Sequence, residues 1–217
     1  KFFMKEDVIP THVSRVTYII APIFIFAPGL ITAIVVPFGP DLVIGGQTIA
    51  LQGTDINIGL LFIFAISSLA VYGTMVGGWA SNNKYSLMGG LRASSQMISY
   101  EISMGLAIIG LAMVTGTLSL REIVLFQSGF NWLIFYQPLG FIIFLVASFA
   151  EAARTPFDLP EAEAELVGGY HTEYGSMKFG LFQLGEYGHM IMGSALLSTL
   201  YFGGDRKSTR LNSSHYS

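Results

Sequence analysis

Long apolar stretches separated by short polar segments set the pattern of the chain. A helix needs about 20 mostly apolar residues to cross the hydrocarbon core of a membrane, which is about 30 Å thick. Stretches close to this length predict membrane-spanning helices at 16–36, 58–80, 93–115, 132–150 and 179–202. We see no internal repeat among them. The pattern therefore predicts an all-α integral membrane protein, built as an irregular bundle of transmembrane helices.

Composition agrees with this class, because 52% of the 217 residues are hydrophobic and only 12% are charged. A soluble domain carries about twice that charged fraction. The chain is also too apolar to be disordered or collagen-like. The sequence has no Cys, which excludes a disulfide scaffold, a thiolate-held iron–sulfur cluster and a Cys-type zinc site in this chain. It shows no metal-spaced His set and no phosphate-cradling glycine motif. We therefore expect no metal, flavin or nucleic-acid site here.

Basic residues are concentrated in the loops on one side of the predicted bundle, and this bias predicts its orientation in the membrane. If the start of the chain is cytoplasmic, the outer loops 37–57 and 116–131 hold only Arg121. The inner segments hold the remaining basic residues before position 205, namely Lys1, Lys5, Arg15, Lys84, Arg92, Arg154 and Lys178. The start, the loop 81–92 and the loop 151–178 are therefore expected on one side, which also collects most carboxylates.

Glycines mark two local structures. The outer loop 37–57 is rich in Gly and Pro, and two short runs at 42–44 and 48–51 flank a glycine pair, so we expect a small hairpin there. Gly73-x-x-x-Gly77 in the second predicted span permits close contact with another helix. Both features have structural roles in this interpretation.

The two ends of the chain indicate a fragment. The first residue is Lys and not Met, and the opening segment lacks the pattern of a signal peptide. Residues 205–217 are polar, basic and without periodicity, and 205–215 match the translation of a common sequencing-library adapter. The alternative is a solvated tail. We predict a membrane-domain fragment over 1–204 and a non-native tail over 205–217.

The inner loop 151–178 holds the densest set of ionisable residues. Its first fifteen residues contain five carboxylates, which are Glu151, Asp158, Glu161, Glu163 and Glu165. Neighbouring carboxylates raise one another's pKa values and can share protons. Arg154 can pair with Glu151 three residues earlier. A solvated acidic loop is the plainer interpretation, but two prolines and the glycine pair at 168–169 favour a fixed shape.

Two further carboxylates lie inside predicted spans. Glu101 and Glu186 each sit several residues into a span, where an ionised and unpaired carboxylate costs about 2.5–3.5 kcal/mol. They are therefore expected to face other helices and to line one polar track joined to the acidic loop. Structural hydrogen bonding is the alternative to a proton path. His189 shares a helix face with Glu186, and we interpret it as a hydrogen-bonded core residue.

Three blocks of residues resemble one family. The first is Glu151-x-x-Arg154-x-Pro-Phe157-Asp158, which continues through the acidic run to Gly-Tyr. The second runs from Ser81 through Lys84 and Arg92 to Glu101, and the third is Glu186-Tyr187. Together they resemble the signature of the membrane subunit that connects the arms of proton-pumping NADH:quinone oxidoreductase, respiratory complex I. Bacteria have it as the H subunit and mitochondria as subunit 1.

The resemblance covers 1–204 with some departures. The family's first span, the amphipathic helix after it and its last two or so spans are absent. Gly185 stands where the family often has Ala, a change that we expect to have no effect. The resemblance implies a bundle of about eight or nine helices, of which five are present here.

The resemblance also implies a function, as part of a translocase for NADH:quinone reduction, with no redox centre in this chain itself. It would form the quinone chamber with peripheral-arm subunits that carry the terminal iron–sulfur cluster, beside small adjoining membrane subunits in a bacterial inner membrane. The bound substrate would be a quinone, either ubiquinone or menaquinone. The implied proton-coupling residues are Glu101, Glu186, Glu151, Asp158, Glu161, Glu163 and Glu165. The implied quinone-binding and loop-anchoring residues are Arg154, Arg92, Phe157, Tyr187 and Lys84.

Three other functions fit part of the pattern. The homologous membrane subunit of a hydrogenase or formate-lyase complex shares the Pro-Phe-Asp signature and need not use a quinone. A secondary transporter also uses intramembrane carboxylates, but such proteins often show two related halves with broken helices. A scaffold that only anchors the peripheral arm would tolerate replacement of Glu101 and Glu186.

Overall fold

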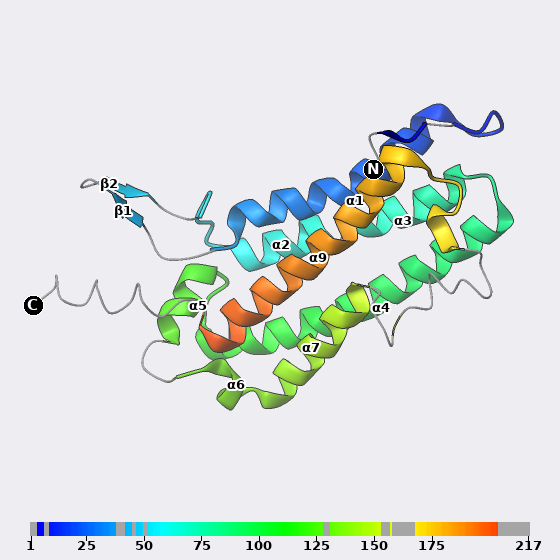
Figure 1. Ribbon diagram of the computed structural model, residues 1–217. Helices are drawn as coiled ribbons and strands as arrows, with labels where there is room; N and C mark the ends of the chain where they lie inside the picture. The colour runs from blue at the N-terminus through cyan, green and yellow to red at the C-terminus, as the bar shows by residue number, and fades with distance from the viewer. Residues whose placement is uncertain are drawn as a thin grey trace, which may run out of the picture.

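The fold is a bundle of helices of very different lengths (Figure 1). The computed structural model describes residues 4–6, 9–37, 42–44, 47–49, 52–127, 131–152, 157 and 168–203. Its elements in chain order are α1 (Arg15–Val35), β1 (Leu42–Ile44), β2 (Gln47–Ile49), α2 (Gly59–Ser67), α3 (Leu69–Ala80), α4 (Lys84–Thr115), α5 (Leu120–Phe126), α6 (Leu133–Tyr136), α7 (Pro138–Glu151), the 3₁₀ turn η3 (Gly169–His171) and α9 (Ser176–Phe202).

The long helices pack in a simple order. α3 lies between α1 and α4, α4 packs on α7, and α9 packs on α1 and also touches α7. The first and last helices of the described chain are therefore neighbours, as Figure 1 shows for α1 and α9. This arrangement confirms the predicted all-α bundle.

The predicted grouping of the loops agrees with the contacts at the two ends of the bundle. At one end, the Ser176 hydroxyl donates to the Lys5 carbonyl at 2.8 Å, and the Asn83 amide donates to the Glu173 carboxylate at 2.8 Å. At the other end, the backbone N–H of Leu60 donates to the Leu118 carbonyl at 3.1 Å. We call the first the N-terminal end and the second the hairpin end, because β1 and β2 lie there (Figure 1).

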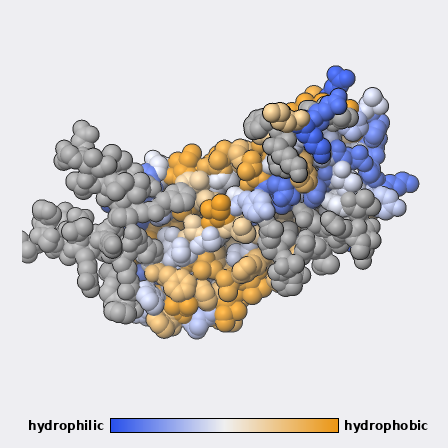
Figure 2. Space-filling view, in the orientation of Figure 1, coloured by the Kyte–Doolittle hydropathy of each residue, from blue (hydrophilic) through white to orange (hydrophobic). Residues whose placement is uncertain are grey.

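A large apolar surface covers the middle of the bundle. Figure 2 shows apolar side chains there and hydrophilic side chains gathered at the N-terminal end. Within the described ranges, three helices are long and apolar enough to cross a membrane: α1, α2 with α3, and α4. α7 is apolar but has only 14 residues, and α9 has 27 residues with Lys178 and Glu186 among them. The count of five spans stays a prediction.

Two polar stretches that the sequence assigned to loops contain helix. α4 begins at Lys84 and not near position 93, because Asn83 accepts a hydrogen bond from the backbone N–H of Tyr85 and so caps the helix early. α5 lies inside the predicted outer loop 116–131. Ser119 and Glu122 form the start of a capping box, in which the serine hydroxyl accepts from the backbone N–H of Glu122.

Two predicted spans are interrupted. Ser68 separates α2 from α3, and its hydroxyl donates to the Ala65 carbonyl at 2.9 Å. Such back-bonding by serine competes with the helical hydrogen bonds and bends helices. Gln137 separates α6 from α7, because Pro138 lacks the N–H that a continuous helix needs. The Gln137 amide instead donates to the Gly110 carbonyl of α4 at 2.7 Å.

Both glycine features are present as predicted. β1 and β2 pair antiparallel with Leu42 opposite Ile49, so the hairpin forms with a second strand one residue earlier than expected. At Gly73 of α3, an added Cβ would lie 2.4 Å from Ile25 Cγ1 and 2.9 Å from the Ile25 nitrogen. Only a glycine lets α3 approach α1 this closely.

Gly185 makes a similar contact from α9, which weighs against the expectation that alanine would be harmless there. An added Cβ would lie 2.4 Å from Ile25 Cγ2 and 3.2 Å from the Ile25 carbonyl carbon. The Ile25 side chain is therefore held from both sides, by Gly73 and by Gly185. We call this pair of contacts the Ile25 clamp.

Gly185→Ala is expected to destabilise the protein by roughly 1–2 kcal/mol, since overpacking outweighs the better helix propensity of alanine. Gly188→Ala is the matched control in the same helix, because nothing lies within 4 Å of its added Cβ. Thermal unfolding of the purified full-length protein in its complex should show a lower midpoint for the first variant only. Equal midpoints for the two variants would contradict the clamp.

Candidate functional site

A small polar cavity lies where α1, α3, α4, α7, η3 and α9 meet. Its volume is about 30 Å³. Six of its lining side chains carry polar groups, and they are Thr74, Gln96, Glu151, Tyr170, Glu186 and His189. The other lining residues are apolar. Three of its lining residues, Ile25, Ala93 and Tyr170, belong to the apolar cluster around Tyr18 and Phe182.

Glu151, the last residue of α7, is the first carboxylate of this cavity. Its Oε1 accepts a hydrogen bond from the Ser67 hydroxyl at 3.3 Å. The same oxygen lies 4.0 Å from His189 Nδ1. The exposed fractions of the two side chains are 16% for Glu151 and 9% for His189. This carboxylate is therefore shielded from solvent and lies beside a group that can carry a proton.

Glu186 of α9 is the second carboxylate. The Tyr170 hydroxyl donates to its Oε1 at 2.5 Å. Tyr170 reaches this position because η3 packs against α4, where an added Cβ at Gly89 would lie 2.8 Å from the Gly169 and Tyr170 backbone. Gly169 has a φ of 72°, a left-handed conformation that glycine adopts readily. The predicted glycine pair therefore places the tyrosine.

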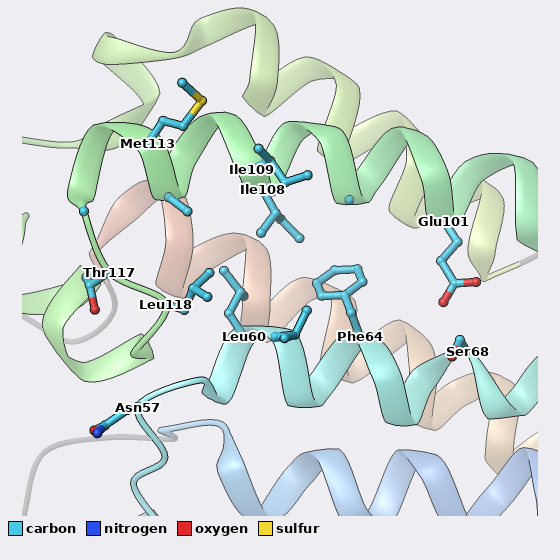
Figure 3. A pocket seen from close by; sticks show the side chains of 14 residues that line it. Asn57, Leu60, Phe64, Ser68, Glu101, Ile108, Ile109, Met113, Thr117 and Leu118 are labelled. Atoms are coloured by element: carbon cyan, nitrogen blue, oxygen red, sulfur yellow. The ribbon is translucent and has the colours of Figure 1, made fainter.

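Glu101 lies in a different and larger cavity, of about 850 Å³, between α2 and α4. Figure 3 shows its carboxyl group pointing from α4 toward Ser68, while the rest of the wall is mostly apolar. Glu151 is close enough to repel Glu101 electrostatically. Ser67 contacts Glu151 and the next residue, Ser68, lines the larger cavity with Glu101. Glu101 and Glu186 thus face protein, but they line two different cavities. Glu151 is adjacent to both cavities. A single polar track that joins Glu101 and Glu186 stays a prediction.

Gln96 of α4 fixes the beginning of the acidic loop. Its amide nitrogen donates to the Ala150 carbonyl at 3.1 Å and to the Phe157 carbonyl at 2.8 Å. The Phe157 ring packs edge-on against Tyr100, with ring centroids 5.4 Å apart. The chain therefore leaves α7 and returns to the same side of α4 within seven residues.

The remaining described candidates lie at the surface. Lys84 and Arg92 are exposed on the N-terminal half of α4, and Tyr187 of α9 is 45% exposed. None of the three lines the small polar cavity. They stay candidates for quinone binding or loop anchoring. Arg154, Asp158, Glu161, Glu163 and Glu165 lie outside the described residues, so their predicted roles also stay predictions.

The segment between η3 and α9 closes the N-terminal end. Tyr174 stacks on Tyr18 of α1 with ring centroids 4.2 Å apart, and the Tyr18 hydroxyl donates to the Glu173 carbonyl at 2.6 Å. Burial raises the pKa of the Tyr174 hydroxyl and lowers the pKa of the His171 imidazole. Both groups are therefore neutral at pH 7, as their packing against apolar rings requires.

Sequence reasoning missed three contributors to the polar cavity. His189 was interpreted as a core residue, although its spacing from Glu186 places both on one face. Tyr170 belonged to the recognised motif but was not singled out. Ser67 carries no sequence signal, because its contact with Glu151 joins residues 84 positions apart.

A profile of the NADH dehydrogenase family matches residues 1–213. The chain belongs to this family. An H subunit of NADH-quinone oxidoreductase from Cytophaga hutchinsonii is 61% identical over 204 residues, which are 94% of this chain and 60% of that protein. The H subunit from Flavobacterium psychrophilum is 54% identical with the same coverage, and the one from Protochlamydia amoebophila is 53% identical over 94% of this chain and 62% of its own length.

These relatives confirm the resemblance to the H subunit of complex I. The chain spans about 60% of the length of the curated relatives it matches. The names of these relatives describe a subunit of an NADH-quinone oxidoreductase. The family match extends to residue 213, so the non-native origin of 205–217 stays a prediction.

Proposed function

We propose that this chain forms part of the quinone chamber of the complex and couples quinone reduction to proton translocation. The observation that supports this most is the cluster of Glu151, Glu186 and His189, shielded within a helical bundle of the NADH dehydrogenase family. Ionisable side chains are costly at such a place and are usually retained for ion or proton movement. The relatives' names favour this function over a hydrogenase component or a transporter.

The chemistry requires proton uptake beside the quinone. Reduction of a quinone to a quinol takes two electrons and two protons, and the electrons would come from the iron–sulfur cluster of a peripheral-arm partner. The acidic loop, from Glu151 to Glu165, would change its protonation as the quinone anion forms and the protons are taken up. Glu151 stands at the junction of this loop with the buried cavity. It would pass the change on to Glu186 on one side and Glu101 on the other.

The proposed function also implies an orientation in the membrane and a set of neighbouring subunits. The N-terminal end, with the acidic loop, would face the cytoplasm of a bacterial inner membrane, since basic residues gather there. Peripheral-arm subunits would dock on this end, and small membrane subunits would adjoin the apolar sides. Ubiquinone and menaquinone both suit the proposed chemistry.

Arg154→Lys and Glu161→Gln, made in the full-length protein within the assembled enzyme, are expected to lower quinone reduction by about tenfold or more, as loss of a positioned acid–base group does. Lys cannot reproduce the bidentate fork of Arg154. NADH oxidation by an artificial acceptor needs only the peripheral arm and should survive. Proton uptake should fall with quinone reduction in both variants.

Arg121→Lys and Glu122→Gln are the matched controls. Both residues are exposed at the hairpin end, where Arg121 lies 3.9 Å from Asp55 and Glu122 accepts from Thr117. They should keep wild-type rates. If the Arg154 and Glu161 variants assemble and also reduce quinone and pump at wild-type rates, the loop is structural and the proposed coupling is wrong.

A further inference from the structure

We propose that His189 is the proton link between Glu186 and Glu151, acting through water in the small polar cavity. This inference rests on the proposed function, because it names the group that joins two of its carboxylates. It reverses the interpretation of His189 as a core residue, and it follows from where the bundle places the imidazole.

The position of His189 carries the inference. Its Nδ1 lies 4.0 Å from Glu151 Oε1, which is within ion-pair distance but too long for a direct hydrogen bond. Its Nε2 is buried and meets no hydrogen-bond partner within bonding geometry in the part of the chain that the structure describes, and the Ile25 backbone of α1 also interacts with the ring. Glu186 lies one helical turn away on α9, lines the same cavity and interacts electrostatically with the imidazole. One ring nitrogen thus faces one carboxylate, while the second carboxylate is within reach across the cavity.

The cavity has the size and chemistry to hold water. A space of about 10–15 Å³ admits one water when two to four polar groups surround it. This cavity measures about 30 Å³ and has six polar side chains on its wall. A water here can bridge the gap of 4.0 Å to Glu151 and can donate to or accept from Nε2.

The proton step balances without any redox change. Protonated Glu186 releases a proton to the cavity water, and that water passes a proton to the unprotonated ring nitrogen of neutral His189. The imidazolium releases the proton on its other nitrogen to the Glu151 carboxylate, directly or through water. Glu186 ends as a carboxylate, Glu151 as a carboxylic acid and His189 as the neutral imidazole, so one proton has moved.

The surroundings leave His189 as the group best suited to this step. The other titratable side chains on the cavity wall are Glu151 from α7, Tyr170 from η3 and Glu186 from α9. α1 contributes Ile25, α3 contributes Thr74, and α4 contributes Gln96 with two apolar side chains, none of which titrates. Tyr170, which belongs to η3, donates its hydroxyl hydrogen bond to Glu186. An imidazole has two ring nitrogens, so it can accept a proton on one while it releases a proton from the other.

The test is His189→Gln and His189→Asn in the full-length protein within the assembled enzyme. Both amides keep hydrogen-bonding capacity but cannot relay a proton. Quinone reduction per assembled complex should fall at least about tenfold in both, as for loss of an acid–base group. The solvent deuterium isotope effect on quinone reduction should rise, and the dependence of the rate on pH near neutrality should flatten. Assembly is measured by NADH oxidation with an artificial acceptor.

His12→Gln is the matched control, since His12 is exposed at the N-terminal end, and it should behave as the wild type. Wild-type rates and isotope effects in the His189 variants would overturn the link. So would a lower rate with an unchanged isotope effect and pH profile, because that result indicates a packing role. If the His189 variants are normal while Arg154→Lys and Glu161→Gln lose quinone reduction, the link fails and the proposed function stands. If all these variants are normal, both fail.

Discussion

Gly89→Ala is expected to disrupt the N-terminal end of the bundle more than any other single methyl group added to α4. The new Cβ would lie 2.8 Å from three backbone atoms, the Gly169 Cα and carbonyl carbon and the Tyr170 nitrogen. A backbone cannot rotate aside as a side chain does, so η3 must separate from α4. We expect a loss of roughly 2–3 kcal/mol in stability, at the upper range for overpacking. The Tyr170 hydroxyl should also leave Glu186.

Gly105→Ala provides the control for this variant. Gly105 is in the same helix, and nothing lies within 4 Å of its added Cβ, so this change should leave stability equal or slightly higher. Thermal dissociation of the assembled complex and quinone reduction are the two measurements. If Gly89→Ala matches Gly105→Ala in both, then η3 does not pack on α4 as described.

Glu186→Gln should abolish most quinone-coupled proton movement while keeping the fold. The amide has the size of the carboxyl group, and its oxygen can still accept from the Tyr170 hydroxyl, which donates to Glu186 at 2.5 Å in the structure. It cannot bind and release a proton. We expect quinone reduction with proton uptake to fall by about one to two orders of magnitude, within the range for loss of an acid–base group.

Glu122→Gln makes the same chemical change at the exposed hairpin end and should leave turnover unaltered. Tyr170→Phe removes the hydrogen bond to Glu186 but keeps the carboxyl group of Glu186. It should therefore lower the rate of quinone reduction less than Glu186→Gln does. Proton uptake per NADH oxidised, measured in sealed vesicles, is the decisive quantity. A wild-type ratio and rate in Glu186→Gln would show that this carboxylate serves only for packing.

The sequence predicted the helices well but not their ends and breaks. Apolar length is a property of each segment alone, so α1 and the second and third spans could be found directly. The early start of α4 depends on the cap at Asn83, and the break before α7 depends on Pro138; both signals are local and were readable. The break at Ser68 was not readable in this way, because a serine within an apolar run is common.

The candidate site was predicted only in part for a similar reason. Glu101, Glu151 and Glu186 stand out as charges within or beside apolar stretches. Their distribution over two cavities depends on how α2, α4, α7 and α9 pack, which no spacing along the chain determines. The same limit applied to Gly185, whose neighbour Ile25 lies 160 positions away in the sequence.

The clamp on Ile25 has a consequence for the order in which the bundle assembles during synthesis. α1 and α3 emerge early and can meet at Gly73 at once, whereas Gly185 arrives only when nearly the whole described chain has been made. α1 must therefore keep one face uncovered, or covered by lipid or an insertion factor, until α9 is in place. Contacts between such distant segments form late, since a long stretch of chain must first be ordered. The carboxylates of the polar cavity consequently come together only once α9 has joined the helices that were made before it.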